Sequence, residues 1–227
     1  MVHSTPSIQT SSHSRFVLAT VSVRLLPWVF FLTAFLGALI ETMFCYLNGA
    51  GWMNRSSVLY GQCSIVWGFG AVLLTLVLHR VQHKRIGTVF LAGAVIGGAY
   101  EYTCSIVSEL VLGTVFWDYS DMPLNIGGRT NVQYCFYWGV LAVLWLKVLY
   151  PPMERIIEKI PPFSGKAVTR LLVMAMLCNS VLTAGAMIRY GERQADVASS
   201  NRIEAFLDAH YDDRRMEERW PNMRIVE

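Results

Sequence analysis

Five apolar runs divide the chain, and each is about as long as a membrane-spanning helix. They cover about residues 26–47, 58–78, 86–112, 131–149 and 170–189. A helix needs ~20 apolar residues to cross the hydrocarbon core of a bilayer. The pattern therefore predicts an all-α protein, a polytopic membrane helical bundle with about five transmembrane helices.

The polar positions between and beyond these runs predict three regions. Residues 1–24 begin Ser/Thr-rich and lack an apolar period, which predicts a disordered cytoplasmic N-terminus. Residues 25–190 form the transmembrane helical domain, and residues 191–227 form a charged C-terminal tail. The first run is too long for the core of a signal peptide and has no convincing cleavage site, so we expect it to be retained.

The basic residues of the short loops predict the orientation in the membrane. One side collects Arg15, Arg24, Arg80, Lys84, Arg85, Arg155, Lys159 and Lys166, whereas the opposite short loops hold Arg55 and Arg129. Cytoplasmic loops are rich in Lys and Arg, so we expect a multi-pass protein of the cell membrane with a cytoplasmic N-terminus. Five spans put the tail outside. If the fifth run is re-entrant or interfacial, the tail is cytoplasmic.

Composition narrows the possible functions. The chain of 227 residues is 54% hydrophobic and only 15% charged, as membrane proteins are. The net charge is +3, and the basic residues form no face separate from the membrane flanks. The expected partner is therefore the lipid bilayer and not nucleic acid. The five cysteines form no metal-binding spacing, and no nucleotide-binding loop or catalytic triad is present. We therefore expect no enzyme activity, no metal and no cofactor.

An internal repeat relates the first two runs to the next two. The segment G37-A-L-I-E41 recurs as G97-G-A-Y-E101, and W67-G-F-G-A-V-L recurs as W138-G-V-L-A-V-L. This predicts two parallel helical hairpins followed by a fifth helix, as in transporters built from parallel repeats. Chance similarity between apolar helices is the alternative. The residues expected at helix contacts are Gly37, Trp67, Gly68, Gly93, Gly97, Trp138 and Gly139.

Acidic residues inside the apolar runs are the main candidates for a site. Glu41 and Glu101 each lie 15 residues after the start of their run, about 22 Å along the helix. Glu109 follows two turns later on the same face as Glu101, above Gly93 and Gly97. Small residues allow a neighbouring helix to approach closely, so this stripe predicts a packed helix face that ends in a polar region.

Two interpretations of these acids remain open. In one, they pair with Arg55 and Arg129 as structural contacts, with Arg129 the expected partner of Glu101. In the other, they line an outward site for a substrate, proton or cation, to which Asp118 and Asp121 would add acid. Intramembrane acids fit either role, because both pairing and ion binding offset the cost of burial.

Two connecting segments carry distinctive patterns. Residues 117–129, W-D-Y-S-D-M-P-L-N-I-G-G-R, combine turn-forming residues with interfacial aromatics, which predicts either an ordered lid over the outward site or an anchored turn. Residues 151–163 carry apolar side chains at helical spacing opposite charged ones. They predict an amphipathic helix on the cytoplasmic surface, either a connector or a docking helix for a partner.

Several motifs resemble a bacterial membrane protein family, CmpB-like or "putative ABC-transporter type IV". They are F35-L-G-A-L-I-E41, the segment from Arg55 to Leu73, Y100-E101, the block from Trp117 to Arg129, Y137-W-G139 and the tail segment 206–223. Gln62 departs from a proline that many members have there. The resemblance implies a permease-like role beside a separate ATP-hydrolysing subunit, and it supplies no substrate or catalytic residue.

The sequence thus favours a permease-like membrane subunit with an outward polar site lined by glutamates. Such a subunit could act as a homo-oligomer or beside an ATPase. The alternative is a non-transporting scaffold that recruits partners, in which the Glu–Arg pairs are structural. An intramembrane metalloenzyme is disfavoured, because no histidine lies at the depth of the acids.

Overall fold

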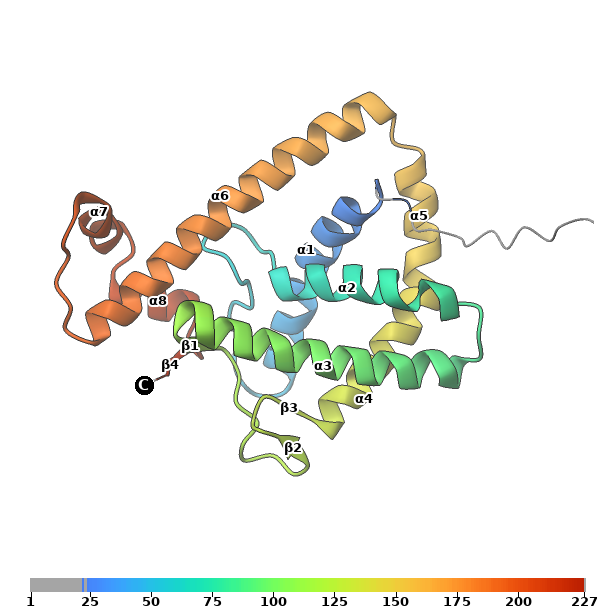
Figure 1. The fold of residues 1–227 in the computed structure, drawn as a ribbon, viewed down its shortest axis with the longest axis horizontal. Helices are drawn as coiled ribbons and strands as arrows, with labels where there is room; N and C mark the ends of the chain where they lie inside the picture. The colour runs from blue at the N-terminus through green and yellow to red at the C-terminus, as the bar shows by residue number, and fades with distance from the viewer. Residues whose placement is uncertain (1–21, 23, 227) are drawn as a thin grey trace, which may run out of the picture.

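The computed structural model describes residue 22 and residues 24–226, so most of the predicted N-terminal disordered region lies outside the described residues. Helices dominate the described chain (Figure 1). In chain order the elements are α1 (Leu26–Leu47), α2 (Ile65–Leu78), the 3-10 turn η1 (His79–Val81), α3 (Ile86–Leu112), β1 (Thr114–Val115), β2 (Asn125–Ile126), β3 (Thr130–Asn131), α4 (Val132–Leu144), the π-helical segment η2 (Trp145–Leu149), α5 (Tyr150–Glu158), α6 (Pro162–Gln194), α7 (Arg202–His210), α8 (Asp213–Arg219) and β4 (Arg224–Ile225).

Four helical stretches are long and apolar enough to cross a membrane, which confirms the helical membrane fold. They are Leu26–Leu47, Ile86–Leu112, Val132–Glu158 and Pro162–Gln194, and a shorter apolar stretch covers Ile65–Val81. The second helix begins later than the predicted 58. Ser64 caps it by accepting a hydrogen bond from the amide of Trp67, and the Oγ of Ser56 bonds the carbonyls of Gly61 and Cys63 in an irregular turn before it.

The first hairpin, α1 and α2, is closed by reciprocal glycine–aromatic contacts. A Cβ on Gly37 would lie only 2.3 Å from the Trp67 ring, and one on Gly68 only 2.6 Å from the Phe30 ring. Each aromatic side chain therefore rests on a bare stretch of the opposite helix. Glycine is required at both positions because any side chain would push the two helices apart.

The second hairpin, α3 and α4, has the same contacts. A Cβ on Gly97 would lie 2.4 Å from Trp138, and one on Gly139 would lie 2.8 Å from the Phe90 ring. Two pairs of contacts with matched spacing do not arise from apolar composition alone. They confirm the internal repeat predicted from the sequence.

The two hairpins meet through α2 and α3. Val29, Leu74, Val89 and Trp145 belong to one buried cluster that includes residues of both hairpins. The indole nitrogen of Trp145 donates to the hydroxyl of Thr75 over 2.8 Å. Each hairpin begins at the same end of the molecule, because Arg24 bonds the carbonyl of Ile160 and Lys147 bonds the carbonyl of Lys84.

The segment after α4 differs from the prediction of a separate surface helix at 151–163. Helix α4 continues through η2 into α5, so residues Val132–Glu158 form one helical stretch. Pro151 and Pro152 have no amide hydrogen, so the regular α-helical pattern cannot run through them, and the π-helical segment precedes them. Ile157 is buried, whereas Ile156 and Arg155 are exposed.

Helix α6 runs back towards the end that carries loops 48–64 and 113–131, which we call the loop end (Figure 1). Its last turns pack with the tail and with Leu59 in a second buried cluster that contains Leu207, Met216 and Trp220. Strand β4 of the tail pairs with β1 after α3. The tail and the two long loops therefore lie on the same side of the helical bundle.

Candidate functional site

In the first hairpin Glu41 is bonded on both carboxylate oxygens. Its Oε1 accepts from the Nε of Arg55 at 2.8 Å and from Nη2 at 2.6 Å, and its Oε2 accepts from the Trp67 indole at 2.7 Å. Burial lowers the pKa of Arg55, but the charge and hydrogen bonds of Glu41 outweigh it, so the pKa is raised. The pair joins loop 48–64 to α1, as the structural interpretation predicted for Arg55.

In the second hairpin Glu101 is the most buried of these acids, with only 8% of its surface exposed. Its Oε1 accepts from the hydroxyl of Tyr119 at 3.0 Å and its Oε2 from the hydroxyl of Thr130 at 2.7 Å. The side chain of Trp138 lies beside it. No ion pair to Glu101 exists among residues 24–226, so neutral donors alone hold this carboxylate.

Arg129 has a different partner from the one predicted. It forms an ion pair with Glu109 and donates to the Ser105 hydroxyl at 3.0 Å, so the expected Glu101–Arg129 pair is wrong. The reason is spacing: Glu109 lies two helical turns further towards the loop end, where residue 129 emerges. The neighbouring Thr130 reaches Glu101 instead.

The two repeats bring these groups together in what we call the central polar cluster. It comprises Glu41, Arg55, Trp67, Glu101, Tyr119, Thr130 and Trp138. The Trp67 and Trp138 rings lie 6.3 Å apart across the hairpin junction. Glu41 and Glu101 are close enough for the charge of one to act on the other.

Loop 113–131 is ordered by its own hydrogen bonds. The amide of Tyr119 donates to the carbonyl of Gly128 at 2.7 Å, and β2 pairs with β3. Gly128 has a φ of +69°, and a Cβ there would lie 2.4 Å from the Ser120 hydroxyl, so only glycine fits the turn. This geometry directs Tyr119 inward to Glu101. Burial and the nearby Glu101 charge raise the pKa of Tyr119, so the residue stays a neutral donor.

Asp118 and Asp121, the other predicted acids, are both exposed. Asp118 accepts from the amide and hydroxyl of Ser120, and these bonds lower the pKa of Asp118. The structure therefore brings Glu41 and Glu101 into one cluster, puts Glu109 and Arg129 beside it, and leaves the two aspartates at the surface.

The two hydroxyl partners of Glu101 are Tyr119 and Thr130, and neither was predicted as a site residue. Both lie in or next to the Trp117–Arg129 block, whose aromatic and turn residues had marked it as special. The tryptophans were predicted as packing residues only. A Trp-Gly pair and a glutamate recur together in both repeats. This recurrence is the sequence feature from which a Trp–Glu contact could have been predicted.

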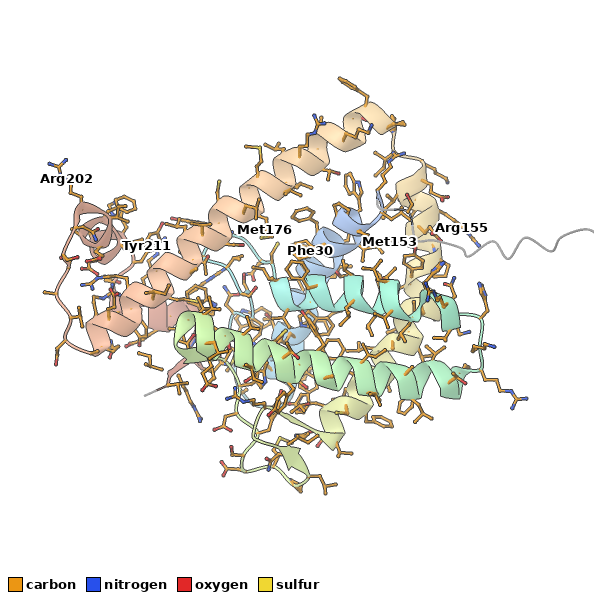
Figure 2. All side chains as sticks on the ribbon, viewed as in Figure 1. Phe30, Met153, Arg155, Met176, Arg202 and Tyr211 are labelled. Atoms are coloured by element: carbon orange, nitrogen blue, oxygen red, sulfur yellow. The ribbon has the colours of Figure 1, made fainter. Side chains whose placement is uncertain are left out.

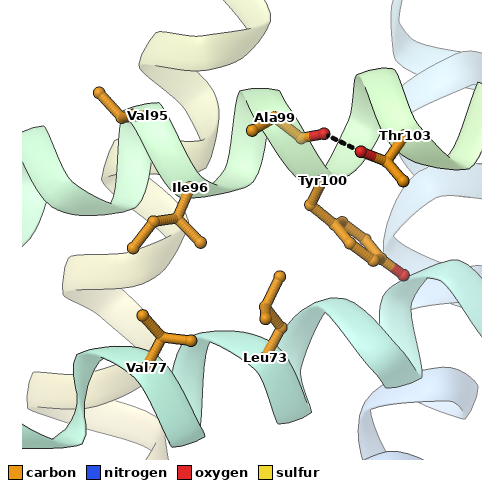
Figure 3. Close-up of a pocket in the computed structure, with 7 residues that line it drawn as sticks. All are labelled: Leu73, Val77, Val95, Ile96, Ala99, Tyr100 and Thr103. Carbon is orange, nitrogen blue, oxygen red and sulfur yellow. Dashed lines mark hydrogen bonds between the residues drawn. The ribbon is translucent and has the colours of Figure 1, made fainter.

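Two apolar grooves lie on the helices, and one of them, along α3, includes Thr130 of the cluster in its lining. The other groove, of about 430 Å³, lies between α2 and α3, where Leu73 and Val77 face Ile96 and Tyr100 (Figure 3). The Tyr100 hydroxyl donates to the carbonyl of Val66 at 2.7 Å and so links the hairpins. Within the described chain, no three His, Cys, Asp or Glu side chains gather as a metal site.

Comparison with known proteins identifies the family. No curated protein and no solved structure matches this chain. A protein-family model matches residues 28–184, which contain both hairpins, the central polar cluster and most of α6. The chain therefore belongs to the family described as "Putative ABC-transporter type IV".

Proposed function

We propose that this chain is a permease-like membrane subunit of a transport system, in which Glu101 is a proton- or cation-binding carboxylate. The observation that carries the proposal is the environment of Glu101. The carboxyl group of Glu101 is only 8% exposed within a membrane helix, is bonded to two hydroxyl groups and has no cationic partner among residues 24–226. Acids in this situation commonly mark ion or proton pathways.

The contacts between the hairpins support a moving part at this position. The hydrogen bonds of Glu41 stay within the first repeat and those of Glu101 within the second. Between the hairpins near the cluster, the Trp138 ring lies against Trp67, and the rings of Trp138 and Tyr100 lie against Gly70 of α2. Transporters built from parallel repeats work by rocking one repeat against the other around a site at their interface.

The partner of this subunit would be a separate ATP-hydrolysing protein, since the chain has no nucleotide-binding motif of its own. Purification of the protein from its native membrane tests this. A co-purifying nucleotide-binding subunit is expected, and its repeated absence would favour the scaffold described below. A homo-oligomer is compatible with α6, whose Leu171, Met174 and Leu177 are exposed to lipid or to a neighbouring chain.

The role of Glu101 is tested by Glu101→Gln alone and with Glu41→Gln. Glutamine keeps the size of the side chain and still accepts hydrogen bonds, so the protein should insert and fold while the transport or growth phenotype is lost. Glu109→Gln is the matched control, because Glu109 lies on the same helix and is already paired with Arg129. If the double variant inserts normally and every phenotype is intact, the proposal is wrong.

A non-transporting scaffold is the second candidate, and the bonding of Glu41 favours it. Both oxygens of that carboxylate are occupied by Arg55 and Trp67, as expected for a purely structural contact. On this view Glu41→Gln and Glu101→Gln should both lower stability without any separate loss of activity. The proposed permease instead predicts that Glu101→Gln separates activity from stability.

A further inference from the structure

Residues 211–226, which we call the strap, cross the loop end of the molecule from one hairpin to the other. The strap contains α8 and β4 and begins at Tyr211, which lies beside the last part of α6 (Figure 2). Its apolar side chains are firmly packed, with Met216 fully buried and Trp220 only 4% exposed. It is therefore a folded part of the molecule and not a loose end.

The strap is bonded to loop 48–64 of the first hairpin. Arg219 donates from Nε to the carbonyl of Val58 at 3.0 Å and from Nη2 to the carbonyl of Gly61 at 2.7 Å. The Trp220 indole donates to the carbonyl of Ser56 at 2.7 Å. Ser56 follows Arg55 directly, so the strap holds the backbone next to the residue that pairs with Glu41.

The strap is also bonded to the segment that follows α3 in the second hairpin. Strand β4 pairs with β1, with Ile225 opposite Thr114, and the amide of Val226 donates to the carbonyl of Gly113 at 2.9 Å. Asn222 donates to the carbonyl of Phe116 at 3.0 Å. These bonds hold the start of the loop that delivers Tyr119 and Thr130 to Glu101.

Loops 48–64 and 113–131 have no direct hydrogen bond to each other among the described residues. Each is bonded to the strap instead, and the strap is fixed to α6 through Arg193, which pairs with Asp213 and donates to the carbonyl of Tyr211. The loop ends of the two hairpins are thus tied together through a third segment. Opening between them at this end requires the strap to leave at least one loop.

We propose that the strap regulates access to the central polar cluster from the loop end. Docked on both loops, it holds the hairpins together over Glu41 and Glu101; released from loop 48–64, it allows them to separate and water to enter. This proposal rests on the proposed function, since access is useful only if the cluster binds something. Arg219 is the positioning residue of the device, because its guanidinium holds two loop carbonyls at once.

Native Cys45 provides a reporter of access. It lies one turn after Glu41 on α1, near the charges of Glu41 and Arg55. With Cys63, Cys104, Cys135 and Cys178 replaced by alanine, its labelling rate by a membrane-impermeant maleimide is measured in reconstituted protein.

Arg219→Ala should raise the rate about tenfold, because it removes charge-assisted hydrogen bonds that keep the strap docked. Arg214→Ala is the matched control, since Arg214 is on the same helix and, within the described part of the chain, forms an ion pair with Glu218 alone.

A distance measurement provides a second readout in case Cys45 is shielded by lipid. Spin labels are attached at Trp52→Cys and Ile126→Cys in a cysteine-free background, because both side chains are exposed on the two loops. Arg219→Ala should lengthen and broaden the distance distribution, whereas Arg214→Ala should leave it unchanged. Equal labelling rates and equal distances in the two variants would overturn the proposal.

The outcomes separate this proposal from the proposed function. Neither readout depends on transport. If Arg219→Ala changes both readouts but Glu101→Gln has no phenotype, the proposal for the strap stands and the proposed role of Glu101 is wrong. Conversely, if Glu101→Gln abolishes the transport or growth function but Arg219→Ala changes neither readout, the ion site stands and the proposal for the strap is wrong.

Discussion

At the scale of single residues, the two repeats give equivalent glutamates different environments. Glu41 has a cationic partner in Arg55, whereas Glu101 has two hydroxyl partners in Tyr119 and Thr130. Opposite charges stabilise an ionised carboxylate directly, whereas hydroxyl donors serve an ionised or a protonated acid. The repeat thus supplies one acid in an ion pair and one that is held by neutral donors.

The Glu41–Arg55 pair leads to a stability prediction. Arg55→Ala leaves the Glu41 charge without its cation in a half-buried position, and we expect a loss of about 1–3 kcal/mol in the free energy of unfolding. The double variant Arg55→Ala with Glu41→Gln should lose less, because no unpaired charge remains. Reversible unfolding in mixed micelles measures both. A double variant less stable than Arg55→Ala would contradict this account of the pair.

At the scale of elements, each hairpin depends on glycines that lie under aromatic rings. Gly37 lies under Trp67 and Gly97 under Trp138, so the distance between the helices is set by the thickness of an indole on a bare backbone. The same contacts bring each tryptophan to the glutamate one turn further along the helix. Packing and site geometry are therefore set by the same residues.

Gly97→Ala should therefore destabilise the second hairpin. The new methyl group would lie 2.4 Å from the Cβ and Cγ of Trp138, atoms close to the backbone that cannot move away cheaply. We expect a loss of about 1–3 kcal/mol, as for overpacked cores. Gly87→Ala on the same helix has open space around it and should be neutral or stabilising by up to about 1 kcal/mol. Thermal unfolding of the two variants in detergent compares them, and equal midpoints would contradict the packing argument.

At the scale of the whole molecule, charge separates the two ends. Arg155 on α5 and Arg202 on α7 lie at opposite ends (Figure 2). At the end of α5, Arg24 and Lys147 bond backbone carbonyls. At the loop end, four arginines are instead paired with acids: Arg189 and Arg193 with Asp208, Arg214 with Glu218, and Arg224 with Asp118. Several arginines of the charged tail are therefore neutralised within the fold, and they do not report its side of the membrane in a simple way.

The Asp208 contacts predict acid sensitivity of the tail. Hydrogen bonds from Arg189, and then those from Arg193, lower the pKa of Asp208 below its usual value despite partial burial. A lowered pKa means that the ionised form stabilises the fold, fully above the unfolded value of about 3.9 and progressively less as the pH falls below it. The hydrogen-exchange protection factors of residues 202–226, which are corrected for the intrinsic pH dependence of exchange, should therefore fall below about pH 4.

Asp208→Asn is the control for this pH effect. The variant lacks the titrating group, so its tail should have lower protection factors at neutral pH and a smaller further fall in acid. Unchanged protection factors of the native tail between neutral pH and pH values well below about 3.9 would show that the Arg189–Asp208 contact does not hold it.

The apolar runs by themselves determined the class of fold, because a segment that long and that apolar has no stable alternative to a helix in lipid. The repeat of glycine, tryptophan and glutamate likewise determined the two hairpins, since the sequence contains both the glycines and the aromatic residues that pack on them. Pairing of Glu41 with Arg55 was one of the interpretations that the sequence left open, and the structure contains this pair.

Only the tertiary structure decided which donor reaches each remaining acid and where the tail lies. Arg129 binds Glu109 and not Glu101 because the turn at Gly127 and Gly128 brings residue 129 out beside Glu109, two helical turns nearer the loop end, and the sequence does not encode the direction of that loop. The strap joins segments more than 100 residues apart, through bonds such as Arg219 to Val58. Such contacts depend on backbone carbonyls that every residue offers, so the sequence alone carries no signal that singles them out.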